Sequence, residues 1–258
     1  FLESIFVKAN VLIILKYNSF IMKNSILFLS LICASCSAPQ DTLLEQVDRL
    51  PVAVQNDFYV SNRAPLQPQQ FIKLPAGTIQ PEGWLKQQLE LQRNGLNGHL
   101  GEISAWLQKK DNAWLETGGQ WGWEEVPYWL RGYANLAYIV QDNEMMNEAR
   151  FWIENILKSQ REDGNFGPVH SNDGKQDFWP NMIVLWIMQS YYEYSNDERV
   201  IDFMTKYCNY LLTVPDEDFL YSYWENSRGG DNLWSVAWLY NRTGDRNLLT
   251  LGEKIHKN

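Results

Sequence analysis

The sequence is poor in cysteine, histidine and positive charge. Its 258 residues include 3 Cys and 3 His, and 22 Lys and Arg are outnumbered by 31 Asp and Glu, which gives a formal charge of -9. This acidic balance argues against a nucleic-acid-binding surface, because binding to phosphates needs clustered Lys and Arg. Since 45% of the residues are hydrophobic, the chain is instead that of a globular protein with a substantial core.

The N-terminal stretch predicts export. The chain begins with Phe rather than Met, and we expect residues 1–21 to be a non-native extension upstream of Met22. The stretch MKNSILFLSLICASCSAPQ then has a Lys, an apolar run and small residues, which is the order of an export signal. CASC followed by Ser resembles a bacterial lipoprotein processing site. Residues 22–36 are therefore predicted to be a signal peptide in which Cys36 becomes lipidated.

Lipidation of Cys36 would hold the protein on the outer membrane, facing the periplasm or the outside. The alternatives are plain secretion and a retained membrane helix. The apolar run is shorter than the roughly 20 residues that a span needs, which makes the retained helix the weakest of the three.

Few cysteines remain for the folded part. Cys33 and Cys36 fall in the predicted signal, which leaves Cys208. A single cysteine permits neither an internal disulfide nor a metal site with several thiolates. Because Cys208 lies on the apolar face of a predicted helix, we interpret it as a small buried hydrophobic residue. We expect no metal site and no cofactor within this chain.

Residues 37–74 are rich in Pro, Gln and Asn, and we interpret them as a tether followed by an extended segment that leads into the helices. Residues 75–258 have a helical pattern. Pro81 predicts the start of a helix through WLKQQLELQRNG that closes at Gly95. A second helical piece is predicted from His99 to Lys110.

Two kinds of helix then alternate along the chain. Residues 126–140 are apolar on nearly every side except at Arg131 and Asn135, whereas residues 144–160 have a single apolar stripe. The same pairing recurs at 179–194 with 197–212, and at 232–241 with 246–258. The turn inside each pair carries an aspartate, and we assign these three a structural role without chemistry: Asp142, Asp197 and Asp245.

Alternation of buried and amphipathic helices predicts an all-α protein of the (α/α)6 toroid type, in which an inner ring contacts protein and an outer ring faces water. A helical solenoid would show shorter and more regular periods, such as 34 residues. In a toroid, the long loops that precede the inner helices meet at one rim and form a pocket there.

The three predicted rim loops are rich in aromatic residues, acids and amides. We predict that they bind substrate through ten residues: Trp121, Trp123, Glu124, Glu125, Asp177, Trp179, Asn181, Arg228, Asp231 and Asn232. Flat rings can stack on sugars, but rings also pack cores.

Structural roles compete with binding at these positions. Glu124 and Glu125 also fit the preference for acids in a first helical turn, and because they are adjacent they do not form a catalytic carboxyl pair. GGDN, at 229–232, is also a capping signal. His99 and His170 are interpreted as hydrogen-bonded packing residues.

Several separated segments are similar to one family of secreted glycoside hydrolases. WLKQQLELQRNGLNGHLGE, GWEEVPYWLRGYANLAY, ILKSQREDGNFGP and LYNRTGD resemble the family that includes the β-L-arabinofuranosidases. The resemblance covers roughly residue 75 to the end. It implies an (α/α)6 barrel followed by β-sandwich domains, and removal of terminal sugars from arabinofuranose-containing plant glycans.

The sequence departs from that family in one respect. Characterised members hold a zinc ion with three cysteines and a glutamate, use one of the cysteines as nucleophile and a separate glutamate as acid/base. No such cysteine cluster is present here. We therefore expect this chain to be the N-terminal part of the barrel, with any zinc site of the full-length protein lying beyond it and the nucleophile unassigned.

Two other functions remain open from the sequence. A non-catalytic surface lipoprotein that binds glycans would show the same aromatic-rich loops, and release of free sugar separates it from a hydrolase. A polysaccharide lyase on the same barrel is disfavoured because its uronate substrates call for a basic cleft, and these loops are acidic. In each case the expected partner is an oligosaccharide or polysaccharide.

Overall fold

The computed structural model describes residues 59–69, 71–169, 171–172 and 174–258. The predicted extension 1–21, the predicted signal peptide with Cys36, and His170 lie outside the described residues. No helix within the described ranges combines the length and the hydropathy that a membrane span requires. The one β ribbon of these ranges is antiparallel, with β1 (Ser171–Asn172) beside β2 (Lys175–Gln176).

The described residues are otherwise mainly helical, as predicted. In chain order the helices are α2 (Gly83–Arg93), α3 (Leu96–Ile103), η1 (Ala105–Leu107), α4 (Glu125–Val140), α5 (Asn143–Lys158), α6 (Trp179–Ser195), α7 (Arg199–Thr213), η2 (Asp216–Asp218), α8 (Tyr223–Ser227), α9 (Gly229–Thr243) and α10 (Asn247–Lys257).

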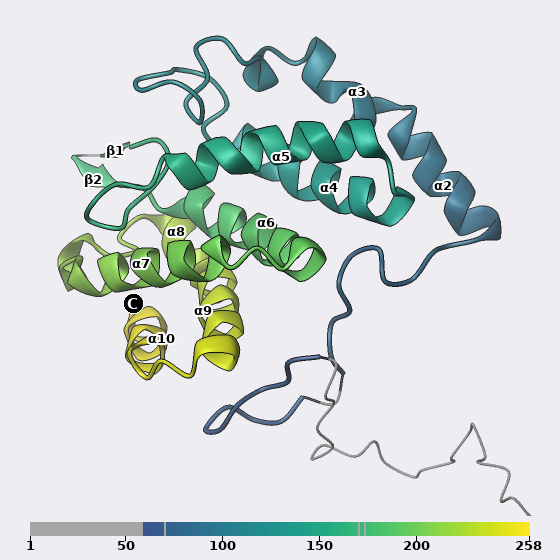
Figure 1. The fold of residues 1–258 in the computed structure, drawn as a ribbon. Helices are drawn as coiled ribbons and strands as arrows, with labels where there is room; N and C mark the ends of the chain where they lie inside the picture. The colour runs from purple at the N-terminus through teal and green to yellow at the C-terminus, as the bar shows by residue number, and fades with distance from the viewer. Residues whose placement is uncertain (1–58, 70, 170, 173) are drawn as a thin grey trace, which may run out of the picture. The chain divides into compact units, whose positions relative to one another are not determined.

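Three helical hairpins form the core of the fold. The pairs α4/α5, α6/α7 and α9/α10 follow one another in Figure 1. The first helices of the pairs are consecutive neighbours, since α4 packs on α6 and α6 packs on α9. On the outside, α5 covers α4 and α10 covers α9. The remaining outer helix, α7, contacts α6, α9 and α10. This arrangement of inner and outer helices confirms the predicted all-α fold of the α/α toroid type.

The outer helices bury the predicted stripes. The apolar stripe of α7 is buried at six residues: Val200, Phe203, Met204, Tyr207, Cys208 and Leu211. The stripe of α5 is buried at Met145, Ala149, Trp152, Ile153 and Ile156, and Leu157 is half-buried at its edge. Cys208 therefore packs as a small hydrophobic residue inside the core, as expected.

Each hairpin turns in the same way. The inner helix ends at a residue with positive φ, namely Gln141 (58°), Asn196 (56°) or Gly244 (72°). The next residue is the predicted aspartate, whose carboxylate accepts backbone N–H bonds from the start of the outer helix, as Asp142 does from Glu144 and Met145. The three aspartates are therefore structural, as predicted.

Three local predictions were wrong. The helical piece predicted from His99 to Lys110 starts earlier, at Leu96, and breaks at Ser104, whose ψ of 123° is extended. The first predicted helix begins at Gly83 rather than at Pro81. The GGDN segment forms the first turn of α9 instead of capping it from outside.

A fourth prediction was wrong for α4, which is not buried on nearly every side. Tyr128 is exposed in its first turn, and Gly132 is exposed one turn later. Of these two residues, Tyr128 faces the start of α6, where its ring lies 5.8 Å from the Trp179 ring.

Candidate functional site

The starts of the three inner helices meet at one surface. The ring of Tyr128, from α4, lies 5.8 Å from the ring of Trp179, from α6. The guanidinium of Arg228, which directly precedes α9, lies 4.0 Å over the Trp179 ring, and its Nη1 donates a hydrogen bond of 3.5 Å to the Tyr128 hydroxyl. With Trp224 of α8, whose ring lies 5.6 Å from the same guanidinium, these residues form what we call the rim surface.

The rim surface has a buried base and an exposed top. Trp179 is buried beneath Arg228, whereas Tyr128 is 45% exposed and Trp224 is 60% exposed. A guanidinium on an aromatic face is stabilised by the charge distribution of the ring. Trp179 therefore fixes the position of Arg228, and two exposed rings flank the cation.

A second layer of similar contacts continues along the inner helices. The Arg131 guanidinium lies 3.9 Å over the Trp186 ring, and the Trp186 indole N–H donates to the Asp231 carbonyl at 3.2 Å. The exposed Trp234 ring lies 6.4 Å from Trp186. Because these contacts link α4, α6 and α9, the shared surface continues along α6 from Trp179 to Trp186.

Buried polar groups hold the start of α6. The Asp177 carboxylate accepts the Trp179 backbone N–H at 2.9 Å, and the Asn181 amide donates to the Phe166 carbonyl at 3.0 Å. Glu225 is fully buried, and its carboxylate accepts the Phe178 N–H at 2.6 Å. Burial raises the pKa of Glu225, with a further contribution from Asp177.

Glu225 therefore ties α8 to the start of α6, and it is enclosed by protein. Its backbone partner Ser222 forms a capping box with it at the start of α8. An enclosed carboxyl that is already engaged by backbone N–H groups supports the rim surface instead of reaching a ligand.

The remaining predicted residues lie at the ends of the same elements. Glu124 and Glu125 are half-buried at the start of α4, and Trp121 is exposed in the preceding loop. The Trp123 carbonyl accepts the Trp114 indole N–H at 3.0 Å. Asn232, in the first turn of α9, is fully buried, and neither of its amide atoms has a hydrogen-bond partner in the described structure.

Sequence reasoning missed three residues of this surface. Tyr128, Trp186 and Trp224 contact the predicted residues but lie inside apolar or loop segments. Tyr128 could have been found from its spacing, since positions 128, 131 and 135 fall on one side of a helix and two of them are polar. The described cavities lie elsewhere, with one of about 260 Å³ between residues 59–75 and the far ends of α6 and α9.

Comparison with known families settles the class of the protein. Residues 52–258 match the family described as Beta-L-arabinofuranosidase, GH127 catalytic domain. The chain belongs to this family. No curated protein and no solved structure matches it. Membership makes the GH127 chain a glycoside hydrolase, and its substrate is a carbohydrate.

The described residues do not fit the zinc site of characterised relatives. No group of three or more His, Cys, Asp or Glu within the described ranges is placed to hold a metal ion. Cys208 is buried in α7, and burial raises the pKa of its thiol to about 12, so the thiol stays protonated. We therefore assign no step of the GH127 reaction to a metal held by these residues.

Proposed function

We propose that the protein is an exported β-L-arabinofuranosidase that acts on arabinofuranose-containing plant polysaccharide, and that the rim surface binds the sugar. The observation that carries this is Arg228, held flat on Trp179 between the exposed rings of Tyr128 and Trp224. The C–H face of a sugar ring stacks on an aromatic ring, while its hydroxyls accept hydrogen bonds from a fixed guanidinium.

Seven of the predicted residues divide into residues at the edges of the rim surface and residues that support it. Half-buried Glu124, Glu125 and Asp231 can accept hydrogen bonds from sugar hydroxyls at the edges of the surface. Trp121 and Trp123 flank the start of α4. We propose Asp177 and Asn181 as supports, because both are buried and bonded within the protein.

Catalysis itself is not assigned to a described residue. Glycoside hydrolysis commonly uses two carboxyl groups about 5 to 9.5 Å apart that both reach the scissile bond. Glu225 has the raised pKa of an acid catalyst but is enclosed by protein. The rim surface is therefore proposed to bind and orient the sugar.

We further propose that the protein reaches the periplasm or the outer membrane through its N-terminal signal, with a lipid anchor at Cys36. The support is the order of Lys, apolar run and small residues ahead of Cys36. Replacement of Cys36 by Ala should abolish metabolic labelling with palmitate and release the protein from membranes. Persistent labelling would contradict this anchor.

Release of L-arabinose tests the proposed activity. Protein expressed from its complete reading frame should release L-arabinose from β-L-arabinofuranosyl oligosaccharides. Arg228→Ala and Tyr128→Ala should each lower kcat/KM by about 5- to 100-fold, equivalent to about 1–3 kcal/mol of lost binding. Glu162→Gln, which removes an exposed carboxylate that is not part of the rim surface, should leave kcat/KM unchanged.

Two results would contradict the proposal. Equal kcat/KM for the Arg228 and Glu162 variants would show that the rim surface does not bind the substrate. Retention of the glycan without any sugar release would favour the alternative of a non-catalytic glycan-binding lipoprotein, which would use the same exposed rings.

A further inference from the structure

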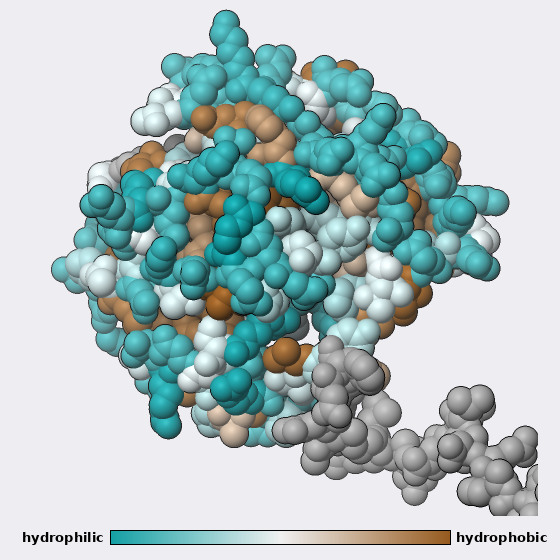
Figure 2. Space-filling model, viewed as in Figure 1, coloured by the Kyte–Doolittle hydropathy of each residue, from teal (hydrophilic) through white to brown (hydrophobic). Residues whose placement is uncertain are grey.

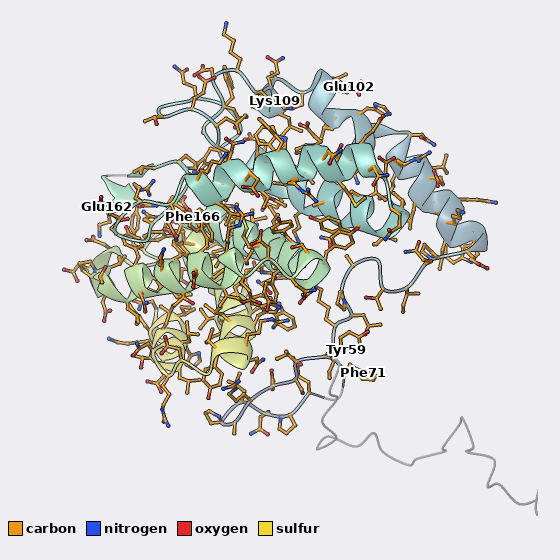
Figure 3. All side chains as sticks on the ribbon, viewed as in Figure 1. Tyr59, Phe71, Glu102, Lys109, Glu162 and Phe166 are labelled. Carbon is orange, nitrogen blue, oxygen red and sulfur yellow. The ribbon has the colours of Figure 1, made fainter. Side chains whose placement is uncertain are left out.

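A cavity of about 850 Å³ lies between α3, η1 and the α4/α5 hairpin. Its volume is in the range of small-molecule sites, roughly 300–1,000 Å³. Figure 3 labels two lining residues, Glu102 on α3 and Lys109 beyond it, on the side of the molecule away from Glu162. Its lining includes Arg93, Glu102, Lys109, Trp129, Tyr133 and Glu148.

The cavity is separate from the rim surface. Tyr133 follows Tyr128 by five positions, which turns it about 140° around the axis of α4. Tyr128 faces Trp179 of the next inner helix, whereas Tyr133 lines the cavity beside α3 and α5. A ligand in the cavity would therefore bind on the opposite side of α4 from the sugar of the proposed activity.

The Tyr133 hydroxyl is a donor at the wall of the cavity. Tyr133 is 5% exposed and lines the cavity. Burial, followed by the charges of four carboxylates, raises the pKa of Tyr133 to about 12, so the hydroxyl remains a donor at neutral pH. A ligand in the cavity can therefore accept a hydrogen bond from Tyr133.

Several charges around the cavity occur as pairs. Lys109 lies 2.9 Å from Glu148, and Arg93 lies 3.3 Å from Asp142. Because these pairs are neutral, and the lining residues Lys110 and Glu144 carry opposite charges, the lining does not favour an ionic ligand. The cavity also lacks a cluster of carboxylates that could hold a metal ion, as judged from the described residues.

The lining instead suits a neutral molecule with many hydroxyls. Carboxylates accept hydrogen bonds, Lys109 and Arg93 donate them, and the Trp129 and Tyr133 rings, 4.5 Å apart, provide an aromatic wall. Alternating donors and acceptors beside aromatic rings match a sugar ring, which has hydroxyls on its edge and C–H groups on its faces.

We propose that this cavity is a second, non-catalytic binding site for a neutral saccharide, with Tyr133 donating a hydrogen bond to a sugar hydroxyl. The site would hold a segment of glycan on the outer side of α4 while another segment occupies the rim surface. It does not depend on hydrolysis, because none of its residues belongs to the rim surface.

The test measures L-arabinose binding by saturation-transfer NMR. The full-length protein used carries Arg228→Ala, so that the rim surface does not contribute to the binding that is measured. Tyr133→Phe keeps the ring and removes only the hydroxyl, and should weaken binding about 5-fold, which is the effect of one hydrogen bond. Glu102→Gln should also weaken it, whereas Glu162→Gln should not. In protein with Arg228 intact, Tyr133→Phe should leave the hydrolysis of short substrates unchanged.

Equal binding by the Tyr133→Phe and Glu162→Gln variants would overturn the proposal, as would absence of L-arabinose binding in the Arg228→Ala protein. Thermal melts establish that each variant is folded, and Glu102→Gln, an exposed position, decides the matter if Tyr133→Phe unfolds. Failure of the proposed activity would instead appear as a lack of sugar release with the cavity still binding.

Discussion

At the scale of single residues, Tyr128 shows why the binding surface was only partly predictable. The sequence placed Trp179 and Arg228 at the same rim, and the structure brings them into contact. Tyr128 lies in an apolar run that was interpreted as buried, and its exposure depends on which side α6 covers. Helical spacing gives the direction of a side chain, but the position of neighbouring helices decides whether it reaches water.

Asp177 and Asn181 illustrate a second limit. Acids and amides before an inner helix were predicted to face substrate, yet both side chains bond to backbone groups within the protein. A loop of this length leaves many backbone groups to be satisfied, and short polar side chains satisfy them readily. The sequence alone does not show which polar residues are used in this way.

Arg199 gives a prediction about pH. Hydrogen bonds from Arg199 lower the pKa of Asp197 and of Glu154 below their ordinary values of 3.8 and 4.5. Because the folded-state values are depressed, the stabilisation is present above the ordinary values and is lost as pH falls through the folded-state values. Arg199→Gln should cost about 0.5–1 kcal/mol at pH 7, given the solvent screening of this pair.

The difference between Arg199→Gln and the unmodified protein should shrink as the pH falls from about 5 towards 2. Urea denaturation across this range measures it. A difference that stays constant, or that grows in acid, would show that Arg199 acts through packing and not through these carboxylates.

At the scale of elements, the hairpins were predicted well because several signals agreed. Apolar stripes located α5 and α7, and the aspartates located the turns. The start of α9 was missed because Gly229 and Gly230 are poor helix formers, which favours the interpretation of GGDN as a cap. The capping signal of this segment belongs to α8 instead, where Ser222 and Glu225 have the spacing of a capping box.

Asp142 provides a test at this scale. Its carboxylate accepts two N–H bonds at the start of α5, so Asp142→Ala should destabilise the protein by about 1 kcal/mol. Asp142→Asn keeps an acceptor oxygen and should retain most of this stability, while losing the ion pair with Arg93. The midpoints of urea denaturation compare the stability of the three proteins. Equal midpoints for Asp142→Ala and for the unmodified protein would contradict the role of Asp142 as a helix cap.

At the scale of the whole molecule, the alternation of buried and amphipathic helices in the sequence was the pattern that best predicted the fold. It predicted which of the helices from α4 to α10 are inner and which are outer. The cavity beside α3 was not predictable, because it depends on loose packing: neither α2 nor α3 contains a buried residue. Figure 2 shows hydrophobic residues reaching the surface near α2. Six large hydrophobic residues of α2, α3 and η1 are exposed: Trp84, Leu85, Leu91, Leu96, Ile103 and Trp106.

This apolar surface predicts self-association of the 258-residue chain, since soluble monomers rarely expose large apolar patches. Light scattering should show that the average molecular mass rises with protein concentration. The double variant Leu91→Gln and Leu96→Gln should show a smaller rise. Lys86→Gln on α2, which is exposed but polar, is the matched control. A monodisperse monomer with a sharp, cooperative melt would refute this prediction.

We propose that the starts of α4, α6 and α9 form the sugar-binding surface. The decisive measurement is a crystal structure of the full-length protein with a β-L-arabinofuranosyl ligand. We expect a sugar ring against Tyr128 or Trp224, with a hydroxyl hydrogen-bonded to the Arg228 guanidinium. A ligand bound only in the cavity beside α3, or at any site that leaves Arg228 on Trp179 without sugar contact, would contradict it.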